Sequence, residues 1–329
     1  MATPGKELLM QVTLDVRRFN PEDANPKPYR KTYTVEAEDY FTVLDALIQV
    51  REYQDPTLAL RCSCRASICG SCAMRINGHA KLACKTKLTS VMDAQGNVRV
   101  EPAGNMPVVK DLIVDMKPFW DKVRAVDPWL QPEGPEPEGE YLAPNEAMLH
   151  LTGVMSCIMC GICVSDCTVL EVDSNFLGPA ALAKAYRFVG DPRDGANVAR
   201  LKKLNEYGGM WDCTRCYECV QVCPKGVAPM DRIMALRDKA ITAGFTGTTG
   251  ARHAEVFAAS IKHTGWLNEF WLLPKTLGMF NPLSLPALLG ALPIALRAVR
   301  HNKLPHMFHK PISGIQHVRR IFDKVEAPK

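Results

Sequence analysis

The spacing of the cysteines constrains this chain more than any other feature of its sequence. Twelve of the thirteen cysteines fall into three groups, and the first group reads C-x4-C-x2-C-x11-C, the spacing of plant-type ferredoxins. The other two groups read C-x2-C-x2-C-x3-C, the spacing of bacterial ferredoxins. Because short turns at these intervals point several sulfurs at one inorganic core, the sequence predicts iron–sulfur centres in series. The groups are Cys64, Cys69, Cys72 and Cys84; Cys157, Cys160, Cys163 and Cys167; and Cys213, Cys216, Cys219 and Cys223.

Two other roles for the cysteines fit the sequence less well. An odd number of cysteines and an opening MATPGKELLM without an apolar segment argue against a secreted disulfide framework. Paired C-x2-C motifs can hold structural zinc, but zinc does not account for the C-x4-C-x2-C run. In two-cluster ferredoxins the fourth cysteine of each run binds the other cluster, which explains the wider final spacing. Cys62 lies outside the groups and is interpreted as a bystander near the first cluster.

The first hundred residues alternate apolar and polar side chains in the manner of β-strands, at Leu9–Val16, Lys31–Val35 and Val98–Glu101. Between them, Thr42–Glu52 carries apolar residues at helical spacing. Strands, a helix, a cysteine-bearing loop and further strands are the order expected of a β-grasp ferredoxin domain. Inside that loop, Gly70 lets the backbone fold closely around the sulfurs.

The chain is expected to become helical after a connector at 127–145 that is dense in Pro, Gly and Glu. Helices are predicted at Glu146–Thr152, Ala180–Val189, Arg193–Leu204 and Met230–Thr242. The fold class is therefore α+β, in three parts. Residues 1–118 form a β-grasp plant-type 2Fe–2S ferredoxin domain, 119–242 an α-helical bacterial-type two-cluster ferredoxin domain, and 243–329 a basic, partly apolar docking tail.

The tail carries most of the positive charge. Residues 243–329 hold eleven Lys and Arg against four Asp and Glu, and six of the eight histidines, in a chain of net charge +5. This asymmetry indicates an acidic partner or an anionic membrane surface, and no nucleic-acid-binding motif accompanies it. Phe280–Leu296 is apolar but contains three prolines, and it is shorter than the about twenty residues of a transmembrane helix. It is expected either to dock on a membrane interface or a partner, or to pack as a helix on its own domain.

Eight short motifs between residues 44 and 226 are specific in combination. They are Leu44–Leu47 (LDAL), Cys64–Met74 (CRASICGSCAM), Ile76–Gly78 (ING), Leu82–Cys84 (LAC), Val108–Met116 (VVKDLIVDM), Leu177–Ala180 (LGPA), Tyr186–Phe188 (YRF) and Cys223–Gly226 (CPKG). Through them the chain resembles the iron–sulfur subunit of succinate dehydrogenase and fumarate reductase, the complex II family, collinearly from about residue 8 to 242. Residues 243–329 fall outside this pattern and more weakly resemble the tails of relatives that dock on subunits of the heterodisulfide reductase type.

The resemblance implies an electron-transfer subunit of a succinate:quinone oxidoreductase or a quinol:fumarate reductase, in the tricarboxylic acid cycle and respiratory chain. A flavoprotein (FAD) subunit performs the substrate chemistry, so this chain, which has no G-x-G-x-x-G fingerprint, is expected to hold no catalytic residue and no metal except the iron of its clusters. Electrons would pass singly to a membrane-anchor or additional redox subunit, with quinone or quinol near the third cluster. The family pattern assigns Cys64, Cys69, Cys72 and Cys84 to a 2Fe–2S cluster, Cys157, Cys160, Cys163 and Cys223 to a 4Fe–4S cluster, and Cys167, Cys213 and Cys219 to the third.

The third centre departs from the commonest family pattern at Cys216. Most relatives have a 3Fe–4S cluster there because a residue other than cysteine stands at this position. A thiolate within the same run has the reach to bind a fourth iron. A second 4Fe–4S cluster is therefore expected, with 3Fe–4S as the alternative.

Three further departures concern the electron acceptor. Val172 and Thr214 stand where well-studied relatives place a Trp and a His of the quinone pocket, and neither offers the same contacts. Thr168 replaces the usual Pro after Cys167. Quinone is therefore expected to bind elsewhere, or electrons to leave through a further redox subunit reached by the tail.

Several matters stay open at the level of sequence. Basic side chains near the first cluster either ease its reduction or form a solvated surface; they are Arg65, Arg75, Lys81, Lys85 and Lys87. The alternative functions are a relay for another flavoprotein, of the glycolate, glycerol-3-phosphate or heterodisulfide type, and, more remotely, a non-catalytic structural or sensor protein. The resemblance also implies a peripheral location on the cytoplasmic face of the cell membrane within a membrane-bound complex.

Overall fold

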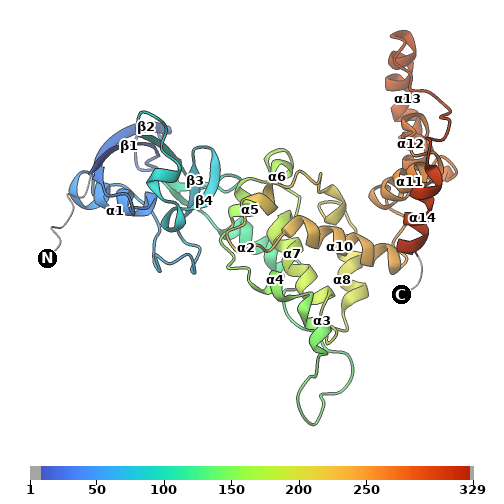
Figure 1. Cartoon of the computed structure of the whole chain (residues 1–329), viewed down its shortest axis with the longest axis horizontal. Coiled ribbons are helices and arrows are strands. Elements are labelled where there is room, and N and C mark those ends of the chain that lie inside the picture. Colours follow the sequence, from blue (N-terminus) through green and yellow to red (C-terminus); the bar gives the residue numbers. More distant parts are fainter. Residues whose placement is uncertain (1–8, 327–329) are drawn as a thin grey trace. The chain divides into compact units, whose positions relative to one another are not determined.

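The computed structural model describes residues 9–326 (Figure 1). Residues 1–8, which carry most of the opening segment discussed above, and residues 327–329 lie outside the described part. The chain divides into two compact units, residues 1–236 and residues 237–329. Each unit is considered by itself below.

A five-stranded sheet forms the beginning of the first unit, with strand order β2-β1-β5-β3-β4. β1 pairs in parallel with β5, and the other neighbours pair antiparallel. This order, with one helix between the second and third strands, confirms the predicted ferredoxin-type domain. The strands are β1 (Met10–Arg18), β2 (Tyr29–Ala37), β3 (Ala73–Ile76), β4 (His79–Leu82) and β5 (Asn97–Glu101).

The helix of this domain, α1 (Val43–Tyr53), closes one side of the core because its apolar face packs on alternate residues of the strands. Leu14 in β1 and Leu47 in α1 are fully buried there. Thr42 starts the helix with a capping box: its Oγ1 accepts from the Asp45 N–H, and the Asp45 carboxylate accepts from the Thr42 N–H. The helix therefore begins at a defined residue, and the loop that carries Cys64, Cys69 and Cys72 follows its C-terminal end.

The rest of the first unit is mainly helical. A two-stranded ribbon, β6 (Val108–Lys110) with β7 (Ile113–Val114), comes before the helices. Every helix predicted from the sequence is present, with shifted ends. The helices are α2 (Lys117–Arg124), α3 (Asn145–Leu149), α4 (Thr152–Met155), α5 (Ile162–Ser165), α6 (Thr168–Val172), α7 (Gly178–Val189), α8 (Asn197–Leu204), α9 (Glu218–Gln221) and α10 (Pro229–Thr242), the last of which runs into the second unit.

One helix starts four residues later than predicted. The sequence suggests a start at Arg193, but α8 begins at Asn197 because two aspartates bind the backbone ahead of it. The Arg193 N–H donates to Asp191 at 3.0 Å, and the Ala196 N–H donates to Asp194 at 3.0 Å. Such side-chain acceptors offer the backbone an alternative to helical hydrogen bonds.

The described residues of the second unit form four α-helices after α10. In it α11 (Thr249–Thr264) packs against α12 (Glu269–Leu277) and α14 (Ile315–Glu326). The remaining helix, α13 (Leu285–Arg300), follows a 3-10 turn at Pro282–Ser284, and Figure 1 shows it extending beyond the other helices of this unit. It touches α12 but none of its residues is buried, so it does not pack into the core of its own domain, one of the two arrangements that the sequence left open.

The prolines interrupt the apolar segment less than the sequence suggests. Pro286 lies in the first turn of α13, where a missing N–H costs little, and only Pro293 is interior. Within residues 9–326, the segment from Pro282 to Arg300 is the one helix long and apolar enough to cross a membrane by length and composition.

Candidate iron–sulfur sites

Three cysteines of the first group, Cys64, Cys69 and Cys72, lie on the loop between α1 and β3, and Cys84 follows β4. The group is organised by backbone N–H groups that point at sulfur. The amides of Ala66, Ile68 and Cys69 donate to Cys64 Sγ at 3.2–3.3 Å. The Ser67 amide donates to Cys84 Sγ at 3.3 Å. N–H···S bonds of this kind stabilise negative charge on sulfur and tune the potential of a bound cluster.

The four thiols of the first group differ in exposure. Cys64 and Cys69 are exposed, Cys84 is half-buried, and Cys72 lies inside the domain core. A hydrogen bond with Ser71 is the main reason that the pKa of Cys69 falls to about 6, whereas burial raises the pKa of Cys72 to about 12. One edge of this centre is therefore open to a partner while the other is anchored in the sheet domain.

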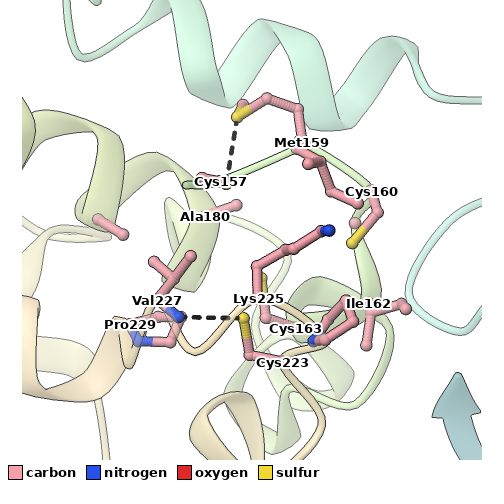
Figure 2. A pocket seen from close by; sticks show the side chains of 14 residues that line it. Cys157, Met159, Cys160, Ile162, Cys163, Ala180, Cys223, Lys225, Val227 and Pro229 are labelled. Atoms are coloured by element: carbon pink, nitrogen blue, oxygen red, sulfur yellow. Dashed lines mark hydrogen bonds between the residues drawn. The ribbon is translucent and has the colours of Figure 1, made fainter. Parts of the chain in front are cut away.

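The second centre is a pocket in the helical domain that gathers four cysteines (Figure 2). Three come from the loop before α5 and from α5 itself, and the fourth follows α9, more than fifty residues later. Cys157 Sγ also lies 3.6 Å from Met159 Sδ, and the Val227 N–H donates to the sulfur of the last cysteine at 3.4 Å. The cysteines around this pocket are Cys157, Cys160, Cys163 and Cys223.

The third centre brings together the remaining four cysteines. Burial is the main reason that the pKa of Cys167 is raised and that the pKa of Cys219 rises to about 12. The neighbouring thiols of Cys213 and Cys216 raise both pKa values further. Thr168 Oγ1 donates to Cys216 Sγ at 3.5 Å. Cys216 therefore lies with the other three thiols rather than apart from them.

The second cysteine of each bacterial-type run has the same local backbone. Met159 (φ 55°) and Gly161 (φ 76°) flank Cys160, and Arg215 (φ 60°) and Tyr217 (φ 68°) flank Cys216, all in the left-handed region. Three of these four residues are not glycine, so the conformation is costly and must be stabilised by its surroundings. The two runs therefore present Cys160 and Cys216 through equivalent turns.

The first and second centres are in direct contact through Gly70, which has φ +75°. A Cβ added to Gly70 would lie 2.7 Å from Cys160 Cβ and 2.9 Å from Cys160 Cα. The loop that carries Cys69 therefore packs directly on the turn that carries Cys160, with no side chain between the two backbones.

An ion pair joins the sheet domain to the end of α5 in the helical domain. Arg75 Nε donates to Asp166 at 3.0 Å, and its guanidinium also reaches the Ser165 carbonyl at 2.6 Å. The other Asp166 oxygen accepts from the Ala80 N–H at 2.7 Å. Asn105 donates to three carbonyls of this loop, including that of Cys167 at 2.9 Å. These contacts position the loop that supplies Cys163 to one centre and Cys167 to the other.

Sequence reasoning missed these positioning residues. It grouped Arg75 with the basic side chains around the first cluster, whereas the structure pairs it with Asp166. It did not single out Asp166 or Asn105, because the hydrogen bonds of both connect residues far apart in the sequence. Cys62 packs against the core of the sheet domain. Val172 and Thr214 are exposed, and Val172 is 90% exposed.

The donor set fits iron–sulfur clusters. Burial raises the pKa of Cys163 well above its usual value, and the neighbouring thiols Cys160, Cys157, Cys219 and Cys223 raise it further. Buried thiols grouped in this way need a cationic core before they can all ionise. Within residues 9–326, no three His, Cys, Asp or Glu side chains are arranged to hold a single metal ion. A plant-type ferredoxin domain followed by a helical domain with two gathered sets of thiols defines an iron–sulfur electron-transfer protein.

Comparisons with known proteins identify the family. Residues 13–121 match the 2Fe-2S iron-sulfur cluster binding domain, and residues 153–227 match the 4Fe-4S dicluster domain. The chain is 39% identical over 237 residues to the fumarate reductase iron-sulfur subunit of Mycobacterium tuberculosis, covering 71% of this chain and 95% of that protein. Among solved structures, a chain of the Mycobacterium smegmatis Sdh1 complex matches with TM-score 0.66 and 27% identity, over 72% of this chain and 98% of that one.

The chain belongs to the family of iron–sulfur subunits of succinate dehydrogenase and fumarate reductase. It is an electron-transfer subunit of such an enzyme, with 2Fe–2S and 4Fe–4S cluster domains.

The comparisons also extend the resemblance into the tail. The 8-methylmenaquinol:fumarate reductase iron-sulfur subunit of Wolinella succinogenes is 32% identical over 309 residues, which is 92% of this chain and 95% of that protein. An alignment of that length must include most of residues 243–329. The expectation that the resemblance stops near residue 242 is therefore wrong for this relative.

Proposed function

We propose that the chain carries single electrons, through three clusters, between a flavoprotein (FAD) subunit that interconverts succinate and fumarate and a membrane-anchor or redox subunit that exchanges electrons with quinone. The observation that carries this proposal is the continuity of the three cysteine groups within one compact unit. Gly70 packs on Cys160, and Cys219 is among the thiols that raise the pKa of Cys163. No gap therefore separates one group from the next.

The residues supply binding and electrostatics, and the clusters supply the one-electron redox chemistry when bound. Backbone amides around Cys64 and Cys84 stabilise thiolate charge at the first centre. Burial around Cys163 and Cys219 excludes water from the second and third. The proposed ligand sets, which the gathering of the thiols supports, are Cys64, Cys69, Cys72 and Cys84; Cys157, Cys160, Cys163 and Cys223; and Cys167, Cys213, Cys216 and Cys219.

The third centre is proposed to be a second 4Fe–4S cluster, with Cys216 as its fourth ligand. Two observations support this assignment. Cys216 raises the pKa of Cys167 and Cys219 as a neighbouring thiol, and its backbone turn repeats that of Cys160. A 3Fe–4S centre would leave this thiol without a role.

Electrons are proposed to leave at the exposed end of the third centre. Cys216 and Thr214 are exposed there, and Tyr217 is half-exposed. Val172 and Thr214 cannot form the quinone contacts expected of a Trp and a His. A further subunit that covers this surface is therefore the proposed acceptor, within a complex on the cytoplasmic face of the cell membrane.

Electron paramagnetic resonance with iron quantitation on the purified complex, titrated with succinate and with quinol, tests the proposal. We expect iron for one 2Fe–2S and two 4Fe–4S clusters, with reduction by either donor. A strong 3Fe–4S signal in the oxidised protein would overturn the assignment of Cys216. Clusters that neither succinate nor quinol reduces would overturn the proposed relay.

A further inference from the structure

The tail contains a long stretch of uniform charge sign. Residues 270–322 include no Asp or Glu but seven Lys and Arg. The middle of this stretch is α13, and its residues 285–296 carry no charge at all. The seven basic residues are Lys275, Arg297, Arg300, Lys303, Lys310, Arg319 and Arg320.

Most of the apolar surface of α13 is exposed within the described residues of the second unit. Leu285, Leu289, Leu292, Ile294 and Leu296 are all more than half exposed, and none of the segment from Pro282 to Arg300 is buried. Water-soluble surfaces rarely leave a continuous apolar patch of this kind uncovered. The helix is neither a core helix nor near the N-terminus, which are the ordinary settings of such a sequence.

The basic residues at the end of α13 indicate the chemistry of the surface that α13 fits. Arg297 and Arg300 occupy the last turn of α13, and Lys303 follows. An apolar helix that ends in basic side chains is complementary to a lipid bilayer, with acyl chains against the leucines and anionic headgroups against the arginines. A protein groove would instead need acidic groups beside an apolar surface.

The length of the uncharged part limits how deep it can reach. The helical and uncharged residues run from Pro282 to Leu296, and these fifteen residues extend about 22 Å, whereas the hydrocarbon core of a bilayer is about 30 Å thick. Spanning would therefore draw Arg297, or the backbone before Pro282, into hydrocarbon at high cost. We propose that α13 inserts into a single leaflet of a membrane with anionic headgroups, with Arg297 and Arg300 at the headgroup level. This inference rests on the proposed membrane location and names the element responsible for it.

Vesicle sedimentation of the purified full-length protein tests the proposal. We expect binding to vesicles that contain phosphatidylglycerol and about twenty-fivefold weaker binding when Arg297→Gln and Arg300→Gln are combined, because each positive charge near an anionic surface contributes about a fivefold factor. Leu289→Glu combined with Leu292→Glu should abolish binding to all vesicles. Leu142→Glu is the matched control, because Leu142 is 84% exposed in the connector, and it should bind as the unchanged protein does.

Trypsin treatment of the bound vesicles tests the depth. If α13 lies in one leaflet, Arg319 and Arg320 stay outside and are cleaved. Protection of these sites inside sealed vesicles would show that the helix spans, and would overturn the proposal. The proposal would also be overturned if the unchanged protein failed to bind the vesicles and was captured instead by an isolated partner subunit. Capture that depends on Leu289 and Leu292 would show that α13 docks on a protein. Reduction of the clusters by succinate is measured separately, so failure of the proposed relay is distinguishable from failure to bind lipid.

Discussion

Gly70 and Cys160 lie so close that a single methyl group cannot be placed between their backbones. The contact joins a loop of the sheet domain to a turn of the helical domain, ninety positions further along the sequence. Because electron transfer falls off steeply with distance, the size of residue 70 bears directly on the coupling of the first two centres.

Replacing Gly70 with alanine should weaken that coupling. The left-handed conformation costs an alanine about 1–2 kcal/mol, and overlap with Cys160 should add about 1–3 kcal/mol of destabilisation. The magnetic interaction between the reduced first and second centres should also fall, as measured by electron paramagnetic resonance.

Gly78→Ala is the control for this change. Gly78 has φ +86° in the turn between β3 and β4, and nothing lies within 4 Å of an added Cβ. It should show the conformational cost with no change in magnetic coupling. Equal spectra for the two variants would contradict the role given to the contact.

Replacing Cys216 with serine should convert the third centre. Loss of one thiolate from a 4Fe–4S cluster leaves three cysteines, so a 3Fe–4S signal should appear in the oxidised protein, with the first two centres unchanged. Cys62→Ser, in the half-buried cysteine that packs on the sheet core, should leave the spectrum as it was. An unchanged spectrum for Cys216→Ser would show that Cys216 is not a ligand.

Replacing Arg75 with glutamine should loosen the junction of the two ferredoxin domains. The change removes the ion pair to Asp166, whose side chain is 7% exposed, and we expect a loss of about 2–3 kcal/mol in the free energy of unfolding. Hydrogen exchange should rise at the Ala80 amide, which donates to the same carboxylate.

Arg99→Gln supplies the comparison for Arg75. Arg99 is exposed on the same sheet and its ion pair with Glu101 is 3.7 Å long, so its removal should cost less than about 1 kcal/mol. Similar losses in the two variants would argue against a positioning role for Arg75.

Asp55 should make the sheet domain sensitive to acid. Burial alone would raise its pKa, but hydrogen bonds from Lys31, Thr57, Tyr33 and Arg18 outweigh burial and hold the pKa well below its usual range. The stabilisation is complete above the unfolded pKa of about 3.9 and is lost as pH falls through the lower folded value.

Asp55→Asn should therefore cost about 3 kcal/mol near neutral pH, and the difference from the unchanged protein should shrink below about pH 4. Urea unfolding followed by circular dichroism at a series of pH values measures this difference. Asp15→Asn, which breaks only a partly exposed ion pair with Arg30, should have a small effect throughout. A difference that grows on acidification would contradict the depressed pKa.

The parts of the structure that follow from local spacing could be predicted. The sheet domain, the α1 helix and the helical character after the connector follow from short-range apolar periodicity, and the cysteine intervals already indicate which thiols meet. The start of α8 was placed too early, because the competing hydrogen bonds of Asp191 and Asp194 do not alter that periodicity.

Contacts between distant residues could not be predicted in the same way. The sequence around Arg75 does not indicate that Asp166 is its partner. It gives Gly70 a role only in folding its own loop around the sulfurs. The isolation of α13 is likewise visible only once the packing of α11, α12 and α14 is known. These are pairings of tertiary structure, and a single sequence carries no local signal for them.

The exchange of final cysteines between the two bacterial-type runs has a consequence for biosynthesis. Cys223 completes the pocket of Cys157, Cys160 and Cys163, while Cys167 lies with the cysteines of the later run. A nascent chain on the ribosome thus lacks a full set of ligands for either helical-domain centre until the last run has emerged. The four cysteines of the first group are all translated by residue 84. The ligand set proposed for the first centre is therefore complete earlier in synthesis than either set proposed for the helical domain.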